Sequence, residues 1–192
     1  GGVAEIIISA WNSPDWPDDP QIGIAKVVKV DREGFSRGHG MNVASKHATG
    51  DVILFTDADI TFTPASMLFG ASVARQGMVC FPLIQYAVDE TNTQWKPWPA
   101  ARGVMFIPRK VWEQTGGFME FWSYGYDDVN MLFKCRHIVG EGGIVREFSG
   151  GVRHMWHAHA ERHKHFTLPR EENAREIKRI RAQFQEDWSR WV

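Results

Sequence analysis

The sequence has few cysteines, no long apolar run and almost no net charge. Its two cysteines, Cys80 and Cys135, lie far apart within apolar stretches of the 192 residues. This pattern excludes a disulfide-rich scaffold and favours buried free thiols, which fit a reducing, cytoplasmic setting. No segment approaches the ~20 consecutive apolar residues that span a bilayer, so we expect no membrane segment in this chain. The formal net charge of −1 gives no indication of nucleic acid as a partner.

Tryptophan and histidine, by contrast, are abundant, with nine and eight residues respectively. Most tryptophans lie between Trp95 and Trp156, and five histidines lie between His154 and His165. The hydrophobic share of 43% and the charged share of 23% are ordinary for a soluble globular protein. Since the length suits one domain, the clustered aromatic residues indicate a binding cleft rather than an evenly filled core.

The hydrophobic pattern alternates between strands and helices, which is typical of an α/β domain with a mostly parallel sheet flanked by helices. Apolar runs predict strands at residues 5–9, 26–30, 51–56, 78–83, 104–107 and 144–148. Helices are expected at residues 41–48, 65–76, 109–115, 127–136 and 171–188. The polar stretch 89–102 is interpreted as a long loop and a candidate lid. Trp95 and Trp98 in it are candidates for stacking on a sugar or a base, with surface packing as the alternative.

Two aspartates, one residue apart, directly follow the predicted strand 51–56. In a parallel sheet Asp57 and Asp59 would point at the carboxyl edge, where ligands gather. Carboxylate oxygens bind Mg²⁺ and Mn²⁺, and such an ion can also bind the phosphates of a ligand. A solvated turn is the alternative, because aspartate is common after strands. The preceding apolar strand favours metal binding but leaves that alternative open.

A second acidic pair stands at the predicted start of a helix. Asp127 and Asp128 follow three aromatic residues, Trp122, Tyr124 and Tyr126. Adjacent like charges beside apolar rings raise at least one pKa, which suits a general base for an incoming hydroxyl group. Capping of the helix is the alternative, because carboxylates favour the N-terminal end of the helix dipole.

The histidine-rich segment offers a pair of imidazoles three residues apart. His154 and His157 could approach one metal ion, and imidazole suits Mn²⁺ or Zn²⁺. His159, His163 and His165 fit a polar surface run better. No cysteine lies nearby to complete a closed zinc site, which argues against a structural zinc ion.

Taken in order, these segments resemble the glycosyltransferases of the GT-A fold. The nearest resemblance is to glycosyltransferase family 7, the β-1,4-galactosyltransferases, and to related bacterial family 2 and chondroitin-polymerase-type domains. Residues 35–38 and 42–43 are similar to the F-N-R-A-x-x-x-N-V-G stretch of family 7, and residues 57–59 to its D-x-D. Residues 116–118 and 121–128 resemble its G-F and Y-W-G-W-G-G-E-D segments, and residues 154–157 its metal-binding segment that ends in histidine.

The resemblance implies a site for Mn²⁺ or Mg²⁺. Asp59 occupies the place of the last D-x-D aspartate, which ligates the metal in that family. His157 matches the second protein ligand, and His154 stands where the segment can offer a further one. Asp57 is the remaining acid of the D-x-D and is expected on the side of the nucleotide sugar.

The same resemblance implies contacts to donor and acceptor. Arg37 matches an arginine that contacts the nucleotide. Asp128 matches the catalytic base, and Asp127 the residue that holds the acceptor. Trp122 and Tyr124 are expected in the sugar site, with Tyr124 replacing an aromatic residue that lines it.

The sequence also departs from the family pattern. The strand predicted at residues 5–9 looks like the second strand of these folds, so the usual first strand is expected to be lacking. Trp11, Asn12 and Ser13 follow that strand and are the candidates for the nucleotide site. Tyr126 stands where the family has glycine.

These inferences together predict a single glycosyltransferase domain. Residues 1–83 would form its nucleotide-binding half, residues 84–165 its donor and acceptor half, and residues 166–192 a C-terminal amphipathic helix. We expect an inverting transferase that moves a sugar from a nucleotide-diphosphate sugar, with a UDP-sugar as the leading expectation, to a hydroxyl group of a glycan or another acceptor. Two alternatives stay open: an inactive module that binds a sugar nucleotide, and a metal-dependent hydrolase.

Overall fold

A computed structural model describes residues 5–11, 25–30, 34–99, 102–121, 126–146, 151–157 and 170–183. The helices are α1 (Arg37–Ser45), α2 (Pro64–Arg75), α3 (Arg109–Thr115), α4 (Asp127–Val139) and α5 (Arg170–Gln183), with a 3₁₀ turn at Glu141–Gly143. The strands are β1 (Ile6–Trp11), β2 (Ala25–Val30), β3 (Val52–Phe55), β4 (Ile60–Phe62), β5 (Val79–Cys80), β6 (Ile84–Ala87), β7 (Trp95–Trp98), β8 (Met105–Pro108), β9 (Ile144–Val145) and β10 (Val152–His154).

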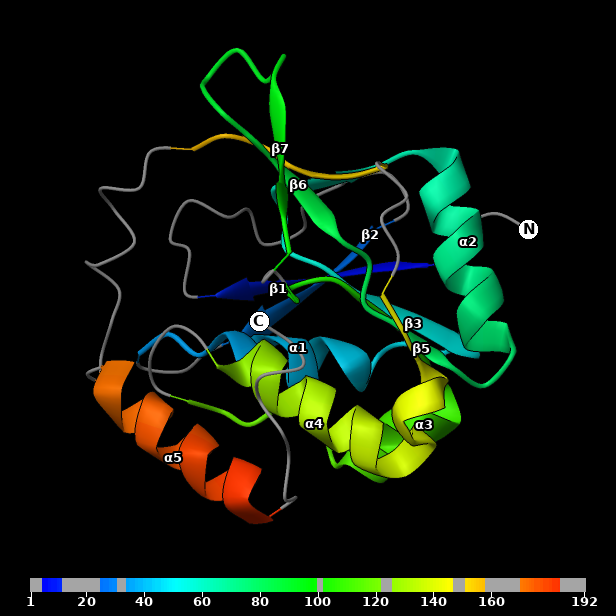
Figure 1. The fold of residues 1–192 in the computed structure, drawn as a ribbon, viewed down its shortest axis with the longest axis vertical. Helices are drawn as coiled ribbons and strands as arrows, with labels where there is room; N and C mark the ends of the chain where they lie inside the picture. The colour runs from blue at the N-terminus through cyan, green and yellow to red at the C-terminus, as the bar shows by residue number, and fades with distance from the viewer. Residues whose placement is uncertain are drawn as a thin grey trace.

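The strands form three sheets, with the orders β1-β2, β3-β8-β5-β9 and β4-β10-β6-β7. Strand β8 comes from the second half of the chain and lies between β3 and β5 of the first half. Its side chains at Met105, Phe106 and Ile107 are all buried: Met105 and Ile107 belong to one hydrophobic cluster and Phe106 to another, and both clusters combine residues from the two halves of the chain. Helix α2 lies beside β3, β5 and β8, and α5 lies beside α4 (Figure 1).

The sheets are only partly parallel, which differs from the mostly parallel sheet that the sequence predicted. Pairs β1–β2, β5–β9 and β6–β10 are parallel, whereas β8 runs antiparallel to both β3 and β5. Strands β1 and β2 form a sheet of their own, which is not joined to β3 within the described residues.

The expectation of a loop throughout residues 89–102 is wrong at its centre. Strand β7 pairs with β6 in an antiparallel hairpin, which projects at the top of Figure 1. Pro97 obscured this strand, since proline disfavours a sheet interior, but β7 is an edge strand and tolerates a missing donor. Strands β4 and β10 were not predicted, because three residues are too few to show an alternating pattern.

Most helices agree with the predicted ranges, but α1 begins four residues before the predicted start at 41. The side chain of Ser36 accepts a hydrogen bond of 3.3 Å from the backbone N–H of His39 and caps the helix. Thr63 caps α2 in the same way, followed by Pro64 at the first helical position. The early start of α1 places Arg37 inside its first turn, where the side chain faces the site described below.

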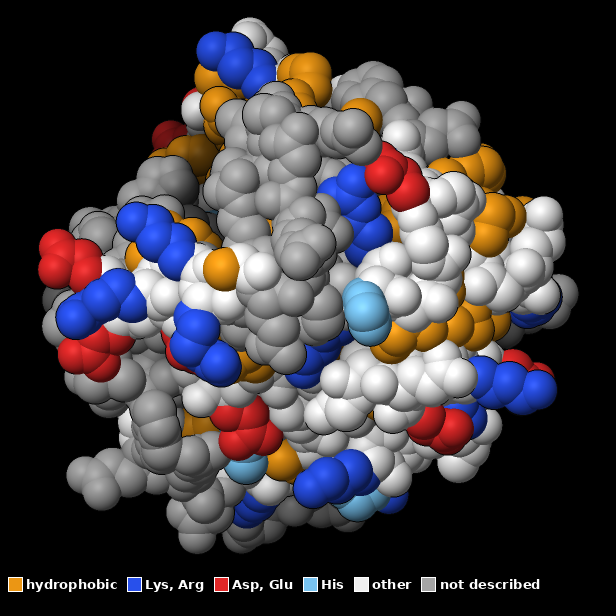
Figure 2. Space-filling view, turned by 60° about the horizontal axis from the view of Figure 1, so that its bottom comes forward, with side chains coloured by type: hydrophobic (Ala, Val, Ile, Leu, Met, Phe, Trp, Pro, Cys, Tyr) orange, Lys and Arg blue, Asp and Glu red, His pale blue; other side chains and the backbone are white. Residues whose placement is uncertain are grey.

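The surface is mixed in charge, in keeping with the net charge of the chain. On the face drawn in Figure 2, basic and acidic side chains are interspersed over the residues that the structure describes. Both cysteines are free and buried, as expected. Among the described helices, none is both long enough and apolar enough to cross a bilayer.

Candidate active site

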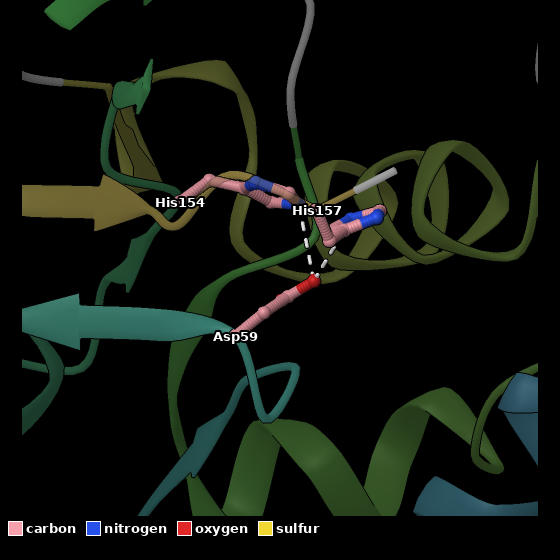
Figure 3. A group of neighbouring side chains, drawn as sticks. All are labelled: Asp59, His154 and His157. Atoms are coloured by element: carbon pink, nitrogen blue, oxygen red, sulfur yellow. Dashed lines mark ion pairs between the residues drawn. The ribbon is translucent and has the colours of Figure 1, made fainter. Parts of the chain in front are cut away.

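Asp59, His154 and His157 converge beyond the end of β3 (Figure 3). The Oδ2 atom of Asp59 lies 3.2 Å from Nε2 of His154 and 3.3 Å from Nε2 of His157. One potential ligand atom from each residue lies within 4.8 Å of the other two. The structure thus brings together all three residues that the sequence predicted as metal ligands.

The sheet pairing explains how residues so distant in sequence meet. Strand β10 runs antiparallel to β4, with His154 opposite Ile60. Just beyond the ladder, the backbone N–H of Met155 donates a hydrogen bond of 2.8 Å to the carbonyl oxygen of Asp59. The register of this ladder therefore sets the separation between the carboxylate and the two imidazoles.

The donor set fits a divalent metal ion. Burial alone would raise the pKa of Asp59, but the hydrogen bond from His154 and the nearby imidazoles outweigh it and lower that pKa. The second carboxylate oxygen, Oδ1, is buried and has no hydrogen-bond partner among the described residues. An orphaned buried oxygen is costly, and a cation would satisfy it. One carboxylate and two imidazoles leave further coordination positions for a ligand.

An aromatic hollow of about 360 Å³ adjoins this cluster. The hairpin β6–β7 and the end of β10 supply its wall, which consists of Tyr86, Ala87, Pro97, Trp98, His154, Met155, Trp156 and His157. Tyr86, Trp98 and Trp156 each expose about two fifths of their surface. The side chain of Asn92 holds the hairpin in place by accepting a 2.8 Å hydrogen bond from the backbone N–H of Trp156. Exposed aromatic residues around a hollow indicate a binding surface.

The two tryptophans of β7 differ in what they contact. The guanidinium of Arg153 lies 4.9 Å from the centre of the Trp95 ring, so that this ring is engaged within the protein. Trp98 instead packs edge-on against Tyr86 and His154, at 5.9 and 6.4 Å between ring centres, and faces the hollow. Of the two predicted stacking candidates, Trp98 is the one placed to contact a ligand there.

A second cluster, the arginine hub, consists of Arg37, Asp57, Asp127 and the carbonyl group of Gly103. The guanidinium of Arg37 donates to Oδ1 of Asp57 at 2.7 Å and to Oδ2 of Asp127 at 2.6 Å. It also donates to the carbonyl oxygen of Gly103 at 2.8 Å. Side chains of Arg37 and Asp127 expose only 12% and 7% of their surface. The hub therefore connects the end of β3, the approach to β8 and the start of α4.

Asp128 lies next to the hub and has the properties of a proton acceptor. Burial and the charge of Asp127 raise its pKa, Arg37 and Arg102 act in the opposite direction, and the net result is a pKa of about 6. Its Oδ1 atom accepts a 2.8 Å hydrogen bond from the backbone N–H of Val129. A carboxyl group that ionises near neutral pH suits general base catalysis.

The remaining predicted site residues either pack against other side chains of the protein or lie outside the described residues. Trp11 ends β1 and packs edge-on against Phe35 and His39, at 5.7 and 5.6 Å between ring centres. Asn12, Ser13, Trp122 and Tyr124 lie outside the described residues, as do His159, His163 and His165. The functional role of each predicted residue remains a prediction.

Sequence reasoning missed Gly103, Arg102 and the aromatic residues Tyr86 and Trp156. A side chain at position 103 would place its Cβ atom 3.1 Å from Oδ2 of Asp57, which explains a glycine beside the hub. Arg102 is buried and its charge acts on Asp128. The sequence signal that could have pointed to Arg102 and Gly103 is their position directly before an apolar strand.

No protein-family model matches the sequence, and no curated protein matches it. Solved structures do resemble the fold. TarS from S. aureus, in complex with UDP-GlcNAc, is 14% identical and has a TM-score of 0.66 over 93% of this chain and 65% of that protein. The catalytic domain of Drosophila β1,4-galactosyltransferase 7, in complex with xylobiose, is 17% identical, with a TM-score of 0.57 over 80% of this chain and 65% of that domain.

A further structure, GalNAc-T7 with UDP, GalNAc and Mn²⁺, is 17% identical and has a TM-score of 0.51 over 88% of this chain and 44% of that one. The present chain thus spans less than two thirds of each of these proteins. Identities this low establish the architecture rather than the activity. The architecture is that of the GT-A glycosyltransferases, with the Asp59, His154 and His157 cluster beyond the carboxyl end of β3.

Proposed function

We propose that this protein is a metal-dependent glycosyltransferase that moves a sugar from a nucleotide-diphosphate sugar to a hydroxyl acceptor with inversion. The observation that carries the proposal is the convergence of Asp59, His154 and His157 in a GT-A fold. The structures of TarS and GalNAc-T7, which were solved with UDP-GlcNAc and with UDP and Mn²⁺, support a UDP-sugar as the donor.

Asp59, His154 and His157 would hold Mn²⁺ or Mg²⁺. The two imidazoles favour Mn²⁺, because Mg²⁺ prefers a shell made of oxygen atoms alone. A divalent cation bound here supplies positive charge that neutralises a diphosphate leaving group. The orphaned Oδ1 atom of Asp59 adds support, since no described side chain competes for it.

Asp128 is the proposed base. Its carboxylate takes the proton from the acceptor hydroxyl group, and the hydroxyl oxygen forms a bond to the anomeric carbon as the bond to the diphosphate breaks. Attack from the face opposite the leaving group inverts the configuration. Asp127, held by Arg37 at 2.6 Å, is proposed to accept a hydrogen bond from the acceptor.

The aromatic hollow supports a saccharide as the acceptor. Trp98 and Trp156 expose ring faces beside two of the proposed metal ligands, so that a sugar ring lying on them would be close to the donor diphosphate. Trp98→Ala is expected to raise KM for a saccharide acceptor about fivefold, because aromatic contacts of this kind contribute roughly 1 kcal/mol. Leu68→Ala removes an exposed apolar side chain from α2 and is the control.

Calorimetric titration of UDP in the presence of Mn²⁺, and again with EDTA, tests the nucleotide and metal site. We expect binding that requires the metal and is lost in Asp59→Ala. Asp51→Ala, which alters an exposed aspartate at the opposite end of β3, should leave binding intact. A folded protein that binds no UDP with Mn²⁺ present would overturn the proposal.

Asp128→Asn separates a transferase from an inactive binding module. Loss of a general base typically lowers the rate 10²- to 10⁴-fold, while metal and UDP binding should persist. Metal-dependent UDP binding by a wild-type protein that transfers no sugar from any tested UDP-sugar would favour the inactive module. Ester or phosphate hydrolysis supported by Zn²⁺ and independent of UDP would favour the hydrolase instead.

A further inference from the structure

Helix α1 is hydrogen-bonded to the segment that leads from α3 towards α4. The carboxamide of Asn42 contacts the backbone of Phe118 on both sides: its Oδ1 atom accepts from the N–H at 2.8 Å, and its Nδ2 atom donates to the carbonyl oxygen at 2.9 Å. Nδ2 also donates to Oε1 of Glu120 at 3.0 Å. We refer to Asn42, the backbone of Phe118 and the side chain of Glu120 as the Asn42 clasp.

The contact between α1 and this segment is unusually close. A Cβ atom at Gly38 would lie 2.2 Å from the carbonyl oxygen of Met119, so no other residue fits there without movement. Gly117 has a φ of +88°, and a Cβ atom there would lie 2.8 Å from Oδ1 of Asn42. From the other side, Lys134 of α4 donates a 2.6 Å hydrogen bond to the carbonyl oxygen of Gly117. The backbone of residues 117–119 therefore lies directly against α1, and Lys134 of α4 binds the same segment.

The clasp is connected to the arginine hub through Phe118. The guanidinium of Arg37 lies 5.9 Å from the centre of the Phe118 ring, which is buried against Phe55 and Trp112. Arg37 in turn holds Asp127 at the start of α4. One helix thus fixes two points of the chain, Phe118 through Asn42 and Asp127 through Arg37.

We propose that Asn42 is a positioning residue for the acidic pair Asp127 and Asp128, acting through Phe118 and Arg37 without touching a substrate. This inference rests on the proposed function for its catalytic meaning, although the structural effect is independent of it. Asn42 lies in the stretch 35–43 that resembles a family 7 segment, but that resemblance implied no role for this residue.

The chemistry of the clasp requires an amide in particular. One planar group must accept from an N–H and donate to two oxygens. Asn42→Asp keeps the acceptor but places a negative charge against the carbonyl oxygen of Phe118 and the carboxylate of Glu120. Like charges repel, and the buried carbonyl group loses its donor, so the segment should separate from α1 while α1 itself persists.

The first arm of the test is steady-state transfer by Asn42→Asp. We expect kcat/KM for transfer to fall roughly tenfold to hundredfold, because displacement of a catalytic group by about 1 Å has an effect of that size. Metal-dependent UDP binding should change less than twofold, since the metal cluster is formed by other elements. Lys46→Ala, an exposed substitution at the C-terminal cap of α1, should match the wild type.

Two further variants distinguish a loss of positioning from a folding defect in Asn42→Asp. Glu120→Ala removes one bond of the clasp at a partly exposed position and should lower transfer by about twofold to threefold. Adding Glu120→Gln to Asn42→Asp removes the repelling charge and supplies a donor, so part of the lost activity should return. Normal transfer by Asn42→Asp, or an equal loss of transfer and UDP binding, would overturn the proposal.

The second arm uses hydrogen exchange and needs no substrate. In Asn42→Asp, the amides of residues 116–121 should exchange at least tenfold faster than in the wild type, whereas those of β3 and β8 should not change. Unchanged exchange in residues 116–121 would refute the clasp itself. This arm decides the structural claim even if the wild-type protein transfers no sugar, so failure of the proposed function and failure of the clasp can be told apart.

Discussion

Asp57 and Asp59 are one residue apart at the end of the same strand, yet their surroundings are opposite. Asp57 pairs with the guanidinium of Arg37 in a hub where one cation is shared by two carboxylates. Asp59 faces two imidazoles, and one of its buried oxygens has no hydrogen-bond partner among the described residues. The two acids of a D-x-D pattern can therefore have different roles. One acid stabilises the protein, and the other is available to a ligand.

The largest expected effect comes from breaking the hub. Arg37→Met leaves Asp127 as a buried carboxylate without its cation, and loss of one partner of a buried ion pair costs roughly 3–5 kcal/mol. Urea denaturation should show this loss in the free energy of unfolding. Arg75→Met, at an exposed position of α2, is the control and should change stability by less than about 0.5 kcal/mol. Similar small changes in both variants would show that solvent already screens the hub.

The next effect separates the two aspartates by metal affinity. Asp59→Asn should weaken Mn²⁺ binding by more than the roughly 10–100-fold that follows loss of an outer-shell partner. Asp57→Asn should weaken it less than tenfold, because the neighbouring guanidinium, rather than the ion, contacts this side chain. Paramagnetic resonance of free Mn²⁺ measures both constants. Equal losses in the two variants would contradict the division of roles.

A smaller effect concerns pH and the acid beside the hub. The pKa of Asp128 is raised to about 6 in the folded protein, so the group binds its proton more tightly there than in the unfolded chain. Its contribution to stability is therefore full below about pH 4 and is lost as the pH rises through 6. Asp128→Asn lacks this titration. Relative to that variant, the wild type should lose on the order of 1 kcal/mol of unfolding free energy between pH 4 and 7.

Chemical denaturation at several pH values measures this difference. Asp127, Arg37 and Arg102 face the group and are present in both proteins. A difference between the two proteins that does not vary with pH would mean that Asp128 ionises at its ordinary pKa, and its assignment as the base would lose support.

The smallest effect tests the backbone that presents the hub. Tyr126 precedes α4 with a φ of +68°, a conformation that favours glycine. Tyr126→Gly and Tyr126→Ala both remove the ring, but only the former relieves the backbone. We expect the glycine variant to be more stable than the alanine variant by about 1 kcal/mol in thermal denaturation. Equal stabilities would indicate that the backbone relaxes elsewhere.

Sequence reasoning selected Asp59, His154 and His157, the three residues that the structure brings together, because these residues carry local signals. An apolar strand before Asp59 and a spacing of three residues between His154 and His157 are visible without a structure. The same reasoning could not separate Asp57 from Asp59. The separation depends on Arg37, which lies 20 residues from Asp57 and 90 from Asp127, and side-chain contacts over such distances leave no periodic pattern.

The fold was predictable for elements long enough to show a period. Helices α2, α3 and α4 begin at or within one residue of the predicted starts, since each has a clear apolar face or a strong boundary residue. Strands β4, β6, β7 and β10, which form one sheet, escaped prediction because tertiary pairing, rather than local propensity, determines them. This sheet lines the aromatic hollow and carries His154, so the region closest to the proposed chemistry was the hardest to foresee.

The ladder between β4 and β10 has a consequence for the order of folding. It joins residues 60–62 to residues 152–154, and the Asp59 carbonyl group receives its hydrogen bond from Met155. Pairing over such a sequence separation is slow, because the loop between the strands must close first. During synthesis the cluster is incomplete until His157 has left the ribosome. Formation of the cluster would therefore report that β4 and β10 have paired, and a chain stalled before that point would hold at most two of its three residues.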